Sequence, residues 1–378
     1  MIDNDVSAAL KNIEPQVMSV LTINLNALAK NYHTLEHTIN NDNVVIAAVV
    51  KANAYGFGMV PISKKLHKEG CRHFFVATVD EGIELRKHIG NDSRIFVLCG
   101  LFSGCEQMLL DSNLIPVINS MYQIGLWTDY SKKIGKKLEA AIHIDTGMCR
   151  NGISMEESDK YSKEISRDID LQLVVSHLAC ADTPDHNLNE LQLKRFKHVL
   201  NAFGNIKGSF SATNGIFLGE DYLFDMVRPG KSIYGFSIRE DKVGSLEPVM
   251  DIFSRIVQIN EIEVGDTIGY GATFAATRKM KTATLGIGYA DGFMRKFSGF
   301  GNGFIGGKQV PIVGRMSMDY AVIDVTDVDN SLLKEGNWVA LTRTPDYTLE
   351  KWALELGTLP HEVACRFGDR VKRVYIGV

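Results

Sequence analysis

The chain has 378 residues, of which 45% are hydrophobic and 23% charged, the ordinary composition of a folded globular protein with room for two domains. A formal net charge of -4 gives no electrostatic basis for binding nucleic acid or an anionic membrane surface, so neither is expected as a partner. No apolar run approaches the ~20 residues of a membrane-spanning helix. The first residues carry Asp3 and Asp5 in place of the basic and apolar regions of a secretory signal, so a cytoplasmic location is expected.

The cysteines do not form a motif. There are six, and no two of them are arranged as CxxC: Cys71, Cys99, Cys105, Cys149, Cys180 and Cys365. In a chain of this length such scatter favours free, mostly buried thiols in a reducing compartment. It gives no support to a zinc site, and we predict no metal.

In the first part of the chain, between residues 20 and 235, apolar strand-like runs alternate with polar segments of helical period. Segments such as 61–69, 81–88 and 191–202 place apolar residues at i, i+3 and i+4. The eight strand candidates are residues 44–50, 73–78, 94–99, 114–119, 139–145, 171–177, 208–213 and 223–228. This α/β alternation predicts an N-terminal (β/α)₈ TIM-type barrel, with a doubly wound open sheet as the main alternative.

After about residue 240 the pattern changes to short strands at close spacing. The strand candidates are 253–262, 267–274, 282–290, 309–314, 320–328 and 337–342, and one helical segment, 349–356, interrupts them. We therefore predict a barrel over residues 1–240 and a mainly β C-terminal domain over 241–378. Residues 1–20 are a candidate to pair with the β domain.

Lys51 follows the first strand candidate directly. The run Val44–Val50 is uncharged and rich in β-branched residues, which indicates a strand buried on both faces. Low-dielectric surroundings at the end of such a strand disfavour an ammonium and favour a neutral, nucleophilic amine. The alternative is a lysine whose stem lies on apolar surface and whose head reaches water. Tyr55 follows four residues later.

Other polar residues also follow strand candidates: Asp145 with Arg150, His177, Asn214, and Arg228 with Gly230. Barrel enzymes build their sites at the carboxyl ends of the strands and often bind phosphate with the loops after strands seven and eight. The turns TNG (213–215) and RPGK (228–231) supply backbone N–H groups suited to a phosphate. This placement favours the barrel, although Arg150 could equally form a surface salt bridge and His177 could be structural.

Glycine-rich turns of the second domain carry further candidates. IGYGATF (268–274) presents Tyr270, GYADGF (288–293) presents Tyr289, and VGRMSMDY (313–320) presents Arg315, Met318 and Asp319. Taken singly, Tyr270 and Tyr289 are more typical of hinge aromatics, and Arg315, Met318 and Asp319 could equally belong to a β-turn.

Taken in order, seven motifs resemble the alanine racemase family over essentially the whole chain. They are VVKANAYG, IDTGMxRxG, SHxA, VRPGxxxYG, GYGATF, GYADG and VGRMSMD. Members of that family have an N-terminal barrel that binds pyridoxal 5'-phosphate, followed by a β-rich domain. They act as head-to-tail homodimers, in which the second domain of one subunit completes the active site of the other.

The resemblance implies a cofactor site in the barrel. Lys51 would hold pyridoxal phosphate covalently, and Arg228, supported by His177, would face its pyridine nitrogen. Tyr55 would contact the phosphate. The remaining cofactor-binding positions are Asn214, Gly215, Gly230, Lys231 and His361.

The resemblance also implies the substrate side of the site. Tyr270 of the partner subunit would be the second acid/base group beside Lys51, because racemisation needs one such group on each face of Cα. Arg150 would orient the cofactor phenolate and the substrate carboxylate. Met318 and Asp319 would lie at the carboxylate end, and Tyr289 would line the entry.

The sequence departs from the family pattern at four positions. His143 stands where many members carry a carbamylated lysine that supports the arginine corresponding to Arg150. His361 replaces a tyrosine that usually touches the phosphate and the substrate methyl group. Phe57 and Gly215 replace a common histidine and a common serine.

The function implied is a pyridoxal-phosphate-dependent racemase that interconverts L- and D-alanine by a two-base mechanism and supplies D-alanine for peptidoglycan. His361 leaves open a racemase for serine or for a broader set of amino acids. A more distant alternative is a non-catalytic pyridoxal-phosphate carrier, but such carriers lack a β domain like the one that contains Tyr270. A decarboxylase of similar architecture does not share the GYGATF and VGRMSMD motifs.

Overall fold

The computed structural model describes residues 4–204, 206–236, 246–342 and 347–377, which form two compact units. The barrel unit consists of Leu28–Ala54 and Met59–Leu246, and the second unit of the residues up to Ala27, Tyr55–Gly58 and those from Glu247 onward. The predicted boundary between residues 240 and 241 lies outside the described residues. No helix in the described ranges is long and apolar enough to cross a membrane.

The first strand candidate closes the barrel. It forms two short strands, β2 (Val45–Ile46) and β3 (Ala48–Val49). β2 pairs in parallel with β10 (Met226–Arg228), and β3 pairs in parallel with β4 (His73–Val76). The strand order is β2-β10-β9-β8-β7-β6-β5-β4-β3, so β2 and β3 are the two end strands. Both belong to the same apolar run, so the sheet is a closed barrel and the open-sheet alternative is wrong.

The other strands follow the predicted order, and every pairing in the barrel is parallel. They are β5 (Arg94–Val97), β6 (Leu114–Ile118), β7 (Glu139–His143), β8 (Asp170–Val175) and β9 (Gly208–Ala212). All eight predicted strands are confirmed. Their residues are largely buried because side chains point both into the barrel and toward the surrounding helices.

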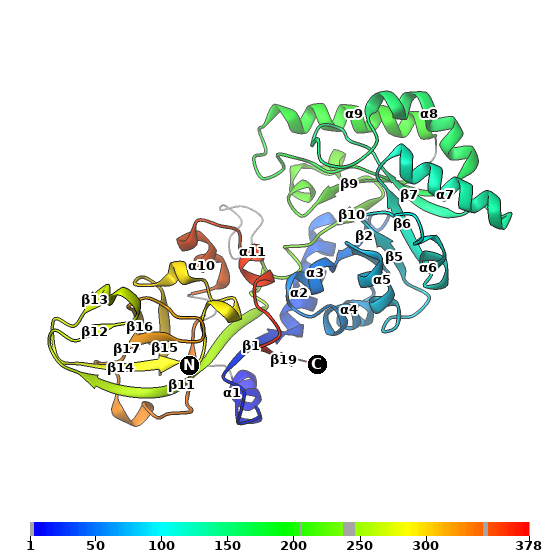
Figure 1. Ribbon diagram of the computed structural model, residues 1–378. Coiled ribbons are helices and arrows are strands. Elements are labelled where there is room, and N and C mark those ends of the chain that lie inside the picture. Colours follow the sequence, from blue (N-terminus) through cyan, green and yellow to red (C-terminus); the bar gives the residue numbers. More distant parts are fainter. Residues whose placement is uncertain (1–3, 205, 237–245, 343–346, 378) are drawn as a thin grey trace. The chain divides into compact units, whose positions relative to one another are not determined.

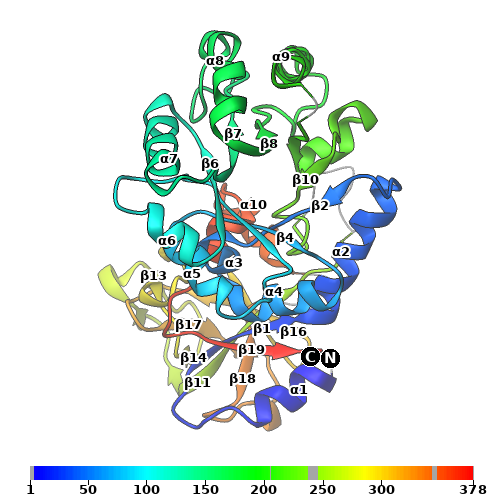
Figure 2. The same cartoon turned by 90° about the vertical axis from the view of Figure 1, so that its right-hand side faces the viewer.

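Helices surround the parallel strands (Figures 1 and 2). They are α2 (Leu25–Ile39), α4 (Met59–Lys68), α5 (Val79–Arg86), α6 (Glu106–Asp111), α7 (Met121–Ile134), α8 (Met155–Asp168) and α9 (Asn187–Phe203). Several begin at the capping residues that the sequence offers. The Ser120 hydroxyl caps α7, and Ser154 with Glu157 forms a capping box at α8.

The second unit is built mainly of antiparallel strands, as predicted. Its eight-stranded sheet contains β1 (Ser19–Asn24), β11 (Met250–Ile262), β14 (Met280–Leu285), β15 (Asn302–Ile305), β16 (Lys308–Val313), β17 (Ala321–Asp324), β18 (Trp338–Ala340) and β19 (Lys372–Ile376). β1 pairs with β11 and β19. β12 (Thr267–Ile268) and β13 (Phe274–Ala275) form a separate pair, and α10 (Leu349–Leu356) matches the predicted helical segment.

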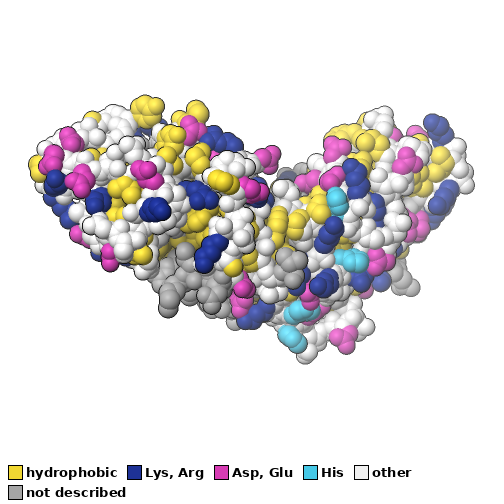
Figure 3. All heavy atoms as spheres, turned by 90° about the horizontal axis from the view of Figure 1, so that it is seen from below, with side chains coloured by type: hydrophobic (Ala, Val, Ile, Leu, Met, Phe, Trp, Pro, Cys, Tyr) yellow, Lys and Arg dark blue, Asp and Glu magenta, His cyan; other side chains and the backbone are white. Residues whose placement is uncertain are grey.

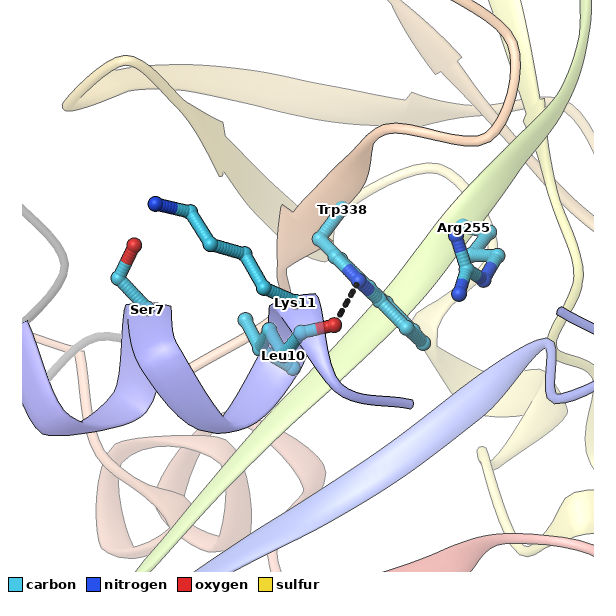
Figure 4. Close-up of a pocket in the computed structure, with 5 residues that line it drawn as sticks. All are labelled: Ser7, Leu10, Lys11, Arg255 and Trp338. Atoms are coloured by element: carbon cyan, nitrogen blue, oxygen red, sulfur yellow. Dashed lines mark hydrogen bonds between the residues drawn. The ribbon is translucent and has the colours of Figure 1, made fainter. Parts of the chain in front are cut away.

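The N-terminal helix α1 (Asn4–Lys11) belongs to this second unit and borders a surface cavity (Figure 4). The indole N–H of Trp338 donates to the Leu10 carbonyl at 3.3 Å, and the Arg255 guanidinium lies 4.2 Å from the Trp338 ring centroid. The cavity, of about 320 Å³, is lined by Ser7, Leu10, Lys11, Arg255 and Trp338. None of the predicted site residues lines it.

Charged side chains of both signs are mixed on the face drawn in Figure 3, where lysine and arginine side chains are interspersed with acidic ones.

The cysteines agree with the sequence prediction only in part. All six cysteines are free thiols, as predicted, but only Cys71 is buried, so the expectation of mostly buried thiols is wrong. Exposed Cys99 and Cys149 lie in loops after barrel strands, where the chain returns to the surface.

Candidate active site

Lys51 begins a left-handed turn at the end of the first barrel strand. The short segment α3 (Lys51–Tyr55) has φ values of 54° at Ala52, 52° at Asn53 and 53° at Ala54. Left-handed backbone costs about 1–2 kcal/mol per residue for side chains other than glycine, so its surroundings must hold this turn in place. Strained backbone of this kind clusters at functional sites.

Glu81, at the start of α5, holds the turn. Its Oε1 accepts from the Ala52 N–H at 2.6 Å, and its Oε2 accepts from the Ala77 N–H at 2.7 Å. The sequence Thr78-x-x-Glu81 has the pattern of a capping box, in which the glutamate would turn back to the cap residue. The Thr78 hydroxyl does cap the helix, but the Glu81 carboxylate instead joins the ends of two neighbouring strands. Sequence reasoning missed this role.

Arg228 is a buried cation at the end of β10, the strand that pairs with β2 and so lies next to the run that ends at Lys51. It is 3% exposed. Its guanidinium donates to Ser209 Oγ at 2.5 Å, to the Ser176 carbonyl at 2.6 Å and to the Phe210 carbonyl at 3.4 Å. These partners are all neutral. Burial lowers the pKa of Arg228 to about 9, which keeps it charged at neutral pH.

His177 follows β8 and lies beside this arginine. Its Nδ1 is 3.5 Å from Arg228 Nη2, and because a guanidinium can only donate, Nδ1 accepts and Nε2 carries the proton. Burial, together with the positive charge of Arg228, lowers the pKa of His177 to about 3. The imidazole is therefore neutral at pH 7.

His143, the last residue of β7, is the second neutral histidine at this end of the barrel. Its Nδ1 lies 2.9 Å from Asn119 Oδ1. The Asn119 amide nitrogen donates to the carbonyls of Leu98 and Val117 at 2.9 and 2.7 Å, so its oxygen must face the histidine and accept. Burial, then Arg228 and Arg150, lower the pKa of His143 to about 4. At neutral pH, Nδ1 thus carries the proton and Nε2 carries a lone pair.

Arg150 is exposed in the loop between β7 and α8. The loop closes on the end of β7, because the Ile153 N–H donates to the His143 carbonyl and the Asp145 N–H to the Ile153 carbonyl, both at 2.9 Å. The Asp145 carboxylate accepts from three N–H groups inside the loop, at 2.9 to 3.1 Å. Asp145 is thus a loop-stabilising residue, and among the described residues Arg150 forms no ion pair.

The two predicted phosphate-binding turns are tied together. Thr213 Oγ1 accepts from the Gly230 N–H at 3.2 Å and lies 3.1 Å from Ser232 Oγ. Asn214 and Gly215 begin a short 3₁₀ turn, and Asn214 Oδ1 is buried with no hydrogen-bond partner among the described residues. A Cβ on Gly215 would lie 2.4 Å from Ser211 Oγ, so a serine would not fit here without displacing Ser211.

Tyr55 and His361 lie together in the second unit. Their ring centroids are 6.0 Å apart, with the rings at 68° to each other. His361 belongs to α11 (Pro360–Cys365), which the Tyr55–Gly58 segment approaches so closely that a Cβ on Gly56 would lie 2.4 Å from the Ala364 carbonyl oxygen. Burial raises the pKa of Tyr55, so its phenol stays protonated and able to donate.

The second unit also contains the predicted substrate-side residues. Tyr270 is 71% exposed, Met318 is 52% exposed and Tyr289 is 44% exposed. The turn of Tyr289 contacts the Met318 segment, since the Ala290 N–H donates to the Met318 carbonyl at 3.0 Å. The Asp319 carboxylate is paired with Arg370 at 2.8 Å, so it is already neutralised within its own unit.

Comparison with known proteins identifies the family. Residues 23–238 match the family "Alanine racemase, N-terminal domain" and residues 249–375 match "Alanine racemase, C-terminal domain". An alanine racemase of Rickettsia akari is 41% identical over 368 residues, covering 95% of this chain and 99% of the relative. A catabolic alanine racemase of Agrobacterium fabrum is 40% identical over 358 residues, covering 94% of this chain and 92% of the relative.

Solved structures give the same result. An alanine racemase of Bartonella henselae with covalently bound pyridoxal phosphate superposes with a TM-score of 0.89 at 36% identity, covering 95% of this chain and 100% of that one. The biosynthetic alanine racemase of Pseudomonas aeruginosa gives a TM-score of 0.84 at 28% identity, covering 95% and 99% of the two chains. These matches span both units and all seven motifs, and the chain belongs to the alanine racemase family.

Proposed function

We propose that this protein is a pyridoxal-phosphate-dependent alanine racemase that interconverts L- and D-alanine and supplies D-alanine for peptidoglycan. The observation that carries the proposal is the placement of Lys51 and of buried Arg228 at the ends of neighbouring barrel strands, with no carboxylate paired to Arg228 among the described residues. A lysine and an uncompensated guanidinium there form a site for an anionic ligand with a carbonyl group.

The residues present fit pyridoxal phosphate. The guanidinium groups of Arg150 and Arg228 bring positive charge, while His143 and His177 are neutral, so this end of the barrel favours an anion. The buried oxygen of Asn214 lacks a partner in the described chain, as expected of a residue at a ligand site. Lys51 would hold the cofactor covalently. Tyr55 and His361, with the backbone at Asn214–Gly215 and Gly230–Lys231, would hold its phosphate.

Arg228 and His177 would set the charge on the cofactor ring. A guanidinium does not release its proton, so a ring nitrogen that it faces remains an acceptor and stays unprotonated. His177 accepts from Arg228 and keeps that side chain in orientation. Bound pyridoxal phosphate supplies the electron withdrawal that makes the Cα proton of an amino acid removable.

Lys51 and Tyr270 are the proposed acid/base pair. Racemisation removes the Cα proton from one face and returns a proton to the other, so two groups are needed. The Lys51 amine would act on one face, and Tyr270 of a second copy in a homodimer would act on the other. Arg150 would bind the substrate carboxylate. Because the Asp319 carboxylate is neutralised by Arg370, Met318 and Asp319 would contact the substrate through their main chain. Tyr289 would line the entry.

The test is a racemisation assay with the purified protein and pyridoxal phosphate. Incubation of L-alanine in D₂O should yield D-alanine by chiral chromatography and deuterium at Cα by NMR. Measuring kcat/KM for a panel of amino acids that includes serine tests the influence of His361 on specificity. Expression should also restore growth, without added D-alanine, of a bacterium that lacks its own alanine racemases. Absence of both Cα exchange and D-alanine would contradict the proposal.

A further inference from the structure

Arg315 lies directly against the glycine turn that carries Tyr270. The main chains of Gly269 and Arg315 form a parallel β-bridge outside the named strands. A Cβ on Gly269 would lie 2.7 Å from the Arg315 carbonyl oxygen and 3.0 Å from its nitrogen. The two segments therefore approach each other to a distance that only glycine permits.

The side chain of Arg315 occupies the other side of the same turn. A Cβ on Gly271 would lie 2.9 Å from Arg315 Nη1, so the guanidinium fills the space that a side chain would take. Gly314 adds a third close approach, because a Cβ on this glycine would lie 2.7 Å from the Ile268 carbonyl oxygen. Tyr270 is thus flanked by two glycines, one accommodating the backbone of Arg315 and the other its guanidinium.

This arrangement matters because little else fixes Tyr270. Its side chain is 71% exposed in the chain described, so its position depends on the backbone of the turn. Gly269 and Gly271 both have positive φ, 76° and 73°, a conformation in which the backbone has many alternatives. Among the described residues the Arg315 side chain makes no hydrogen bond or ion pair that would hold it away from the turn.

We propose that Arg315 is a positioning residue for Tyr270: its guanidinium, packed against Gly271, holds the turn that presents the phenol. This inference rests on the proposed function, in which Tyr270 is an acid/base group. A group that transfers a proton must be held within hydrogen-bonding reach of its target, and displacement by about 1 Å can cost roughly 100-fold in rate.

A double-mutant cycle tests the contact. The variants are Arg315→Met, Gly271→Ala and the double variant, each checked for folding by its Tm. Gly271→Ala should lower kcat roughly 10- to 100-fold with a much smaller change in KM, because the added methyl displaces the guanidinium. Gly271 has positive φ, so the methyl group strains the turn in either background, but in the Arg315→Met background it meets no guanidinium and its loss of kcat should be clearly smaller. Equal losses in both backgrounds would overturn the proposal.

Gly269→Ala is the matched control. Its methyl group would meet the Arg315 backbone, which Arg315→Met leaves in place. Its loss of kcat should therefore be the same in both backgrounds. Relief of the Gly269→Ala defect by Arg315→Met would contradict the assignment of the contact to the guanidinium.

A second readout needs neither cofactor nor activity. In cofactor-free protein labelled with 3-fluorotyrosine, the ¹⁹F resonance of Tyr270 is assigned by its absence in Tyr270→Phe. Arg315→Met should shift this resonance, and an unchanged resonance would overturn the proposal. If the wild-type protein does not racemise alanine, the proposed function fails, while the ¹⁹F experiment still decides whether Arg315 holds Tyr270.

Discussion

The side-chain oxygen of Asn119 lies 2.9 Å from Nδ1 of His143 and determines which imidazole nitrogen carries the proton. Asn119 cannot turn its amide over, because its nitrogen already donates to two main-chain carbonyls. His143 therefore offers a neutral acceptor at the position where the family pattern has a carbamylated lysine.

The pKa of His143 predicts a loss of stability in acid. Its folded-state pKa of about 4 lies below the ordinary value of 6.5, so the unfolded chain binds more protons between these pH values. The free energy of unfolding should fall as pH falls through this window, by roughly 3 kcal/mol at most from this group. Urea unfolding at pH 7 and pH 4.5 should show a smaller fall in His143→Gln. An equal fall in both proteins would contradict the prediction.

Glu81→Gln should weaken the turn that begins at Lys51. The amide can accept at only one of the two N–H groups that the carboxylate now binds, which should lower the free energy of unfolding by about 1.5–3 kcal/mol. Glu84→Gln, on the same helix, is the control. Its carboxylate forms only surface pairs with Lys87 and His88, so the expected change is below about 1 kcal/mol. Equal effects in denaturant unfolding would count against the role of Glu81.

Ser209→Ala should destabilise the protein through Arg228. The substitution removes the hydroxyl that accepts from the buried guanidinium, and loss of such a charge-assisted hydrogen bond costs about 1.5–3 kcal/mol. Ser209 also donates to the Met226 carbonyl at 2.7 Å, so the comparison is Ser211→Ala on the same strand, whose hydroxyl makes the equivalent neutral bond to the Tyr222 carbonyl and should cost about 1 kcal/mol. Denaturant titration of both variants measures the difference. A Ser209 variant no less stable than the Ser211 variant would be inconsistent with this account.

Lys51→Ala should abolish covalent attachment of pyridoxal phosphate. After incubation with the cofactor and reduction by borohydride, intact-protein mass spectrometry should find one adduct in the wild type and none in the variant. Lys87→Ala removes an exposed lysine outside the proposed site and serves as the control, so its adduct should persist. A full adduct in Lys51→Ala would assign the attachment to another lysine.

Tyr270→Phe should spare cofactor binding and remove most turnover. Loss of one acid/base group in proton transfer costs about 10²–10⁴-fold, and kcat should fall in both directions of racemisation. Tyr289→Phe, at the proposed entry, should lose much less. Chiral chromatography measures the racemisation rates of both variants. Formation of the pyridoxal phosphate adduct checks that each variant is loaded with cofactor. Intact racemisation in Tyr270→Phe would rule out the two-base assignment.

Much of the fold follows from local patterns. Uncharged runs such as Val44–Val50 are strands because their side chains suit burial on both faces, and their alternation with helical segments predicts a barrel. The same patterns place Lys51, His177 and Arg228 at strand ends. These features depend on residues close together in the sequence, which is why the sequence alone determines them.

The tertiary structure decided which partners hold these residues. Glu81, Asn119 and Ser209 each form a hydrogen bond to a group at the end of another strand. From the local sequence alone, Glu81 is a helix-capping residue, Asn119 a turn residue and Ser209 an ordinary strand residue. The exposed cysteines and the engagement of Asp145 within its own loop likewise depend on how loops return to the barrel. Closure of the sheet brings distant strand ends together, and only that closure determines which buried polar groups can satisfy each other.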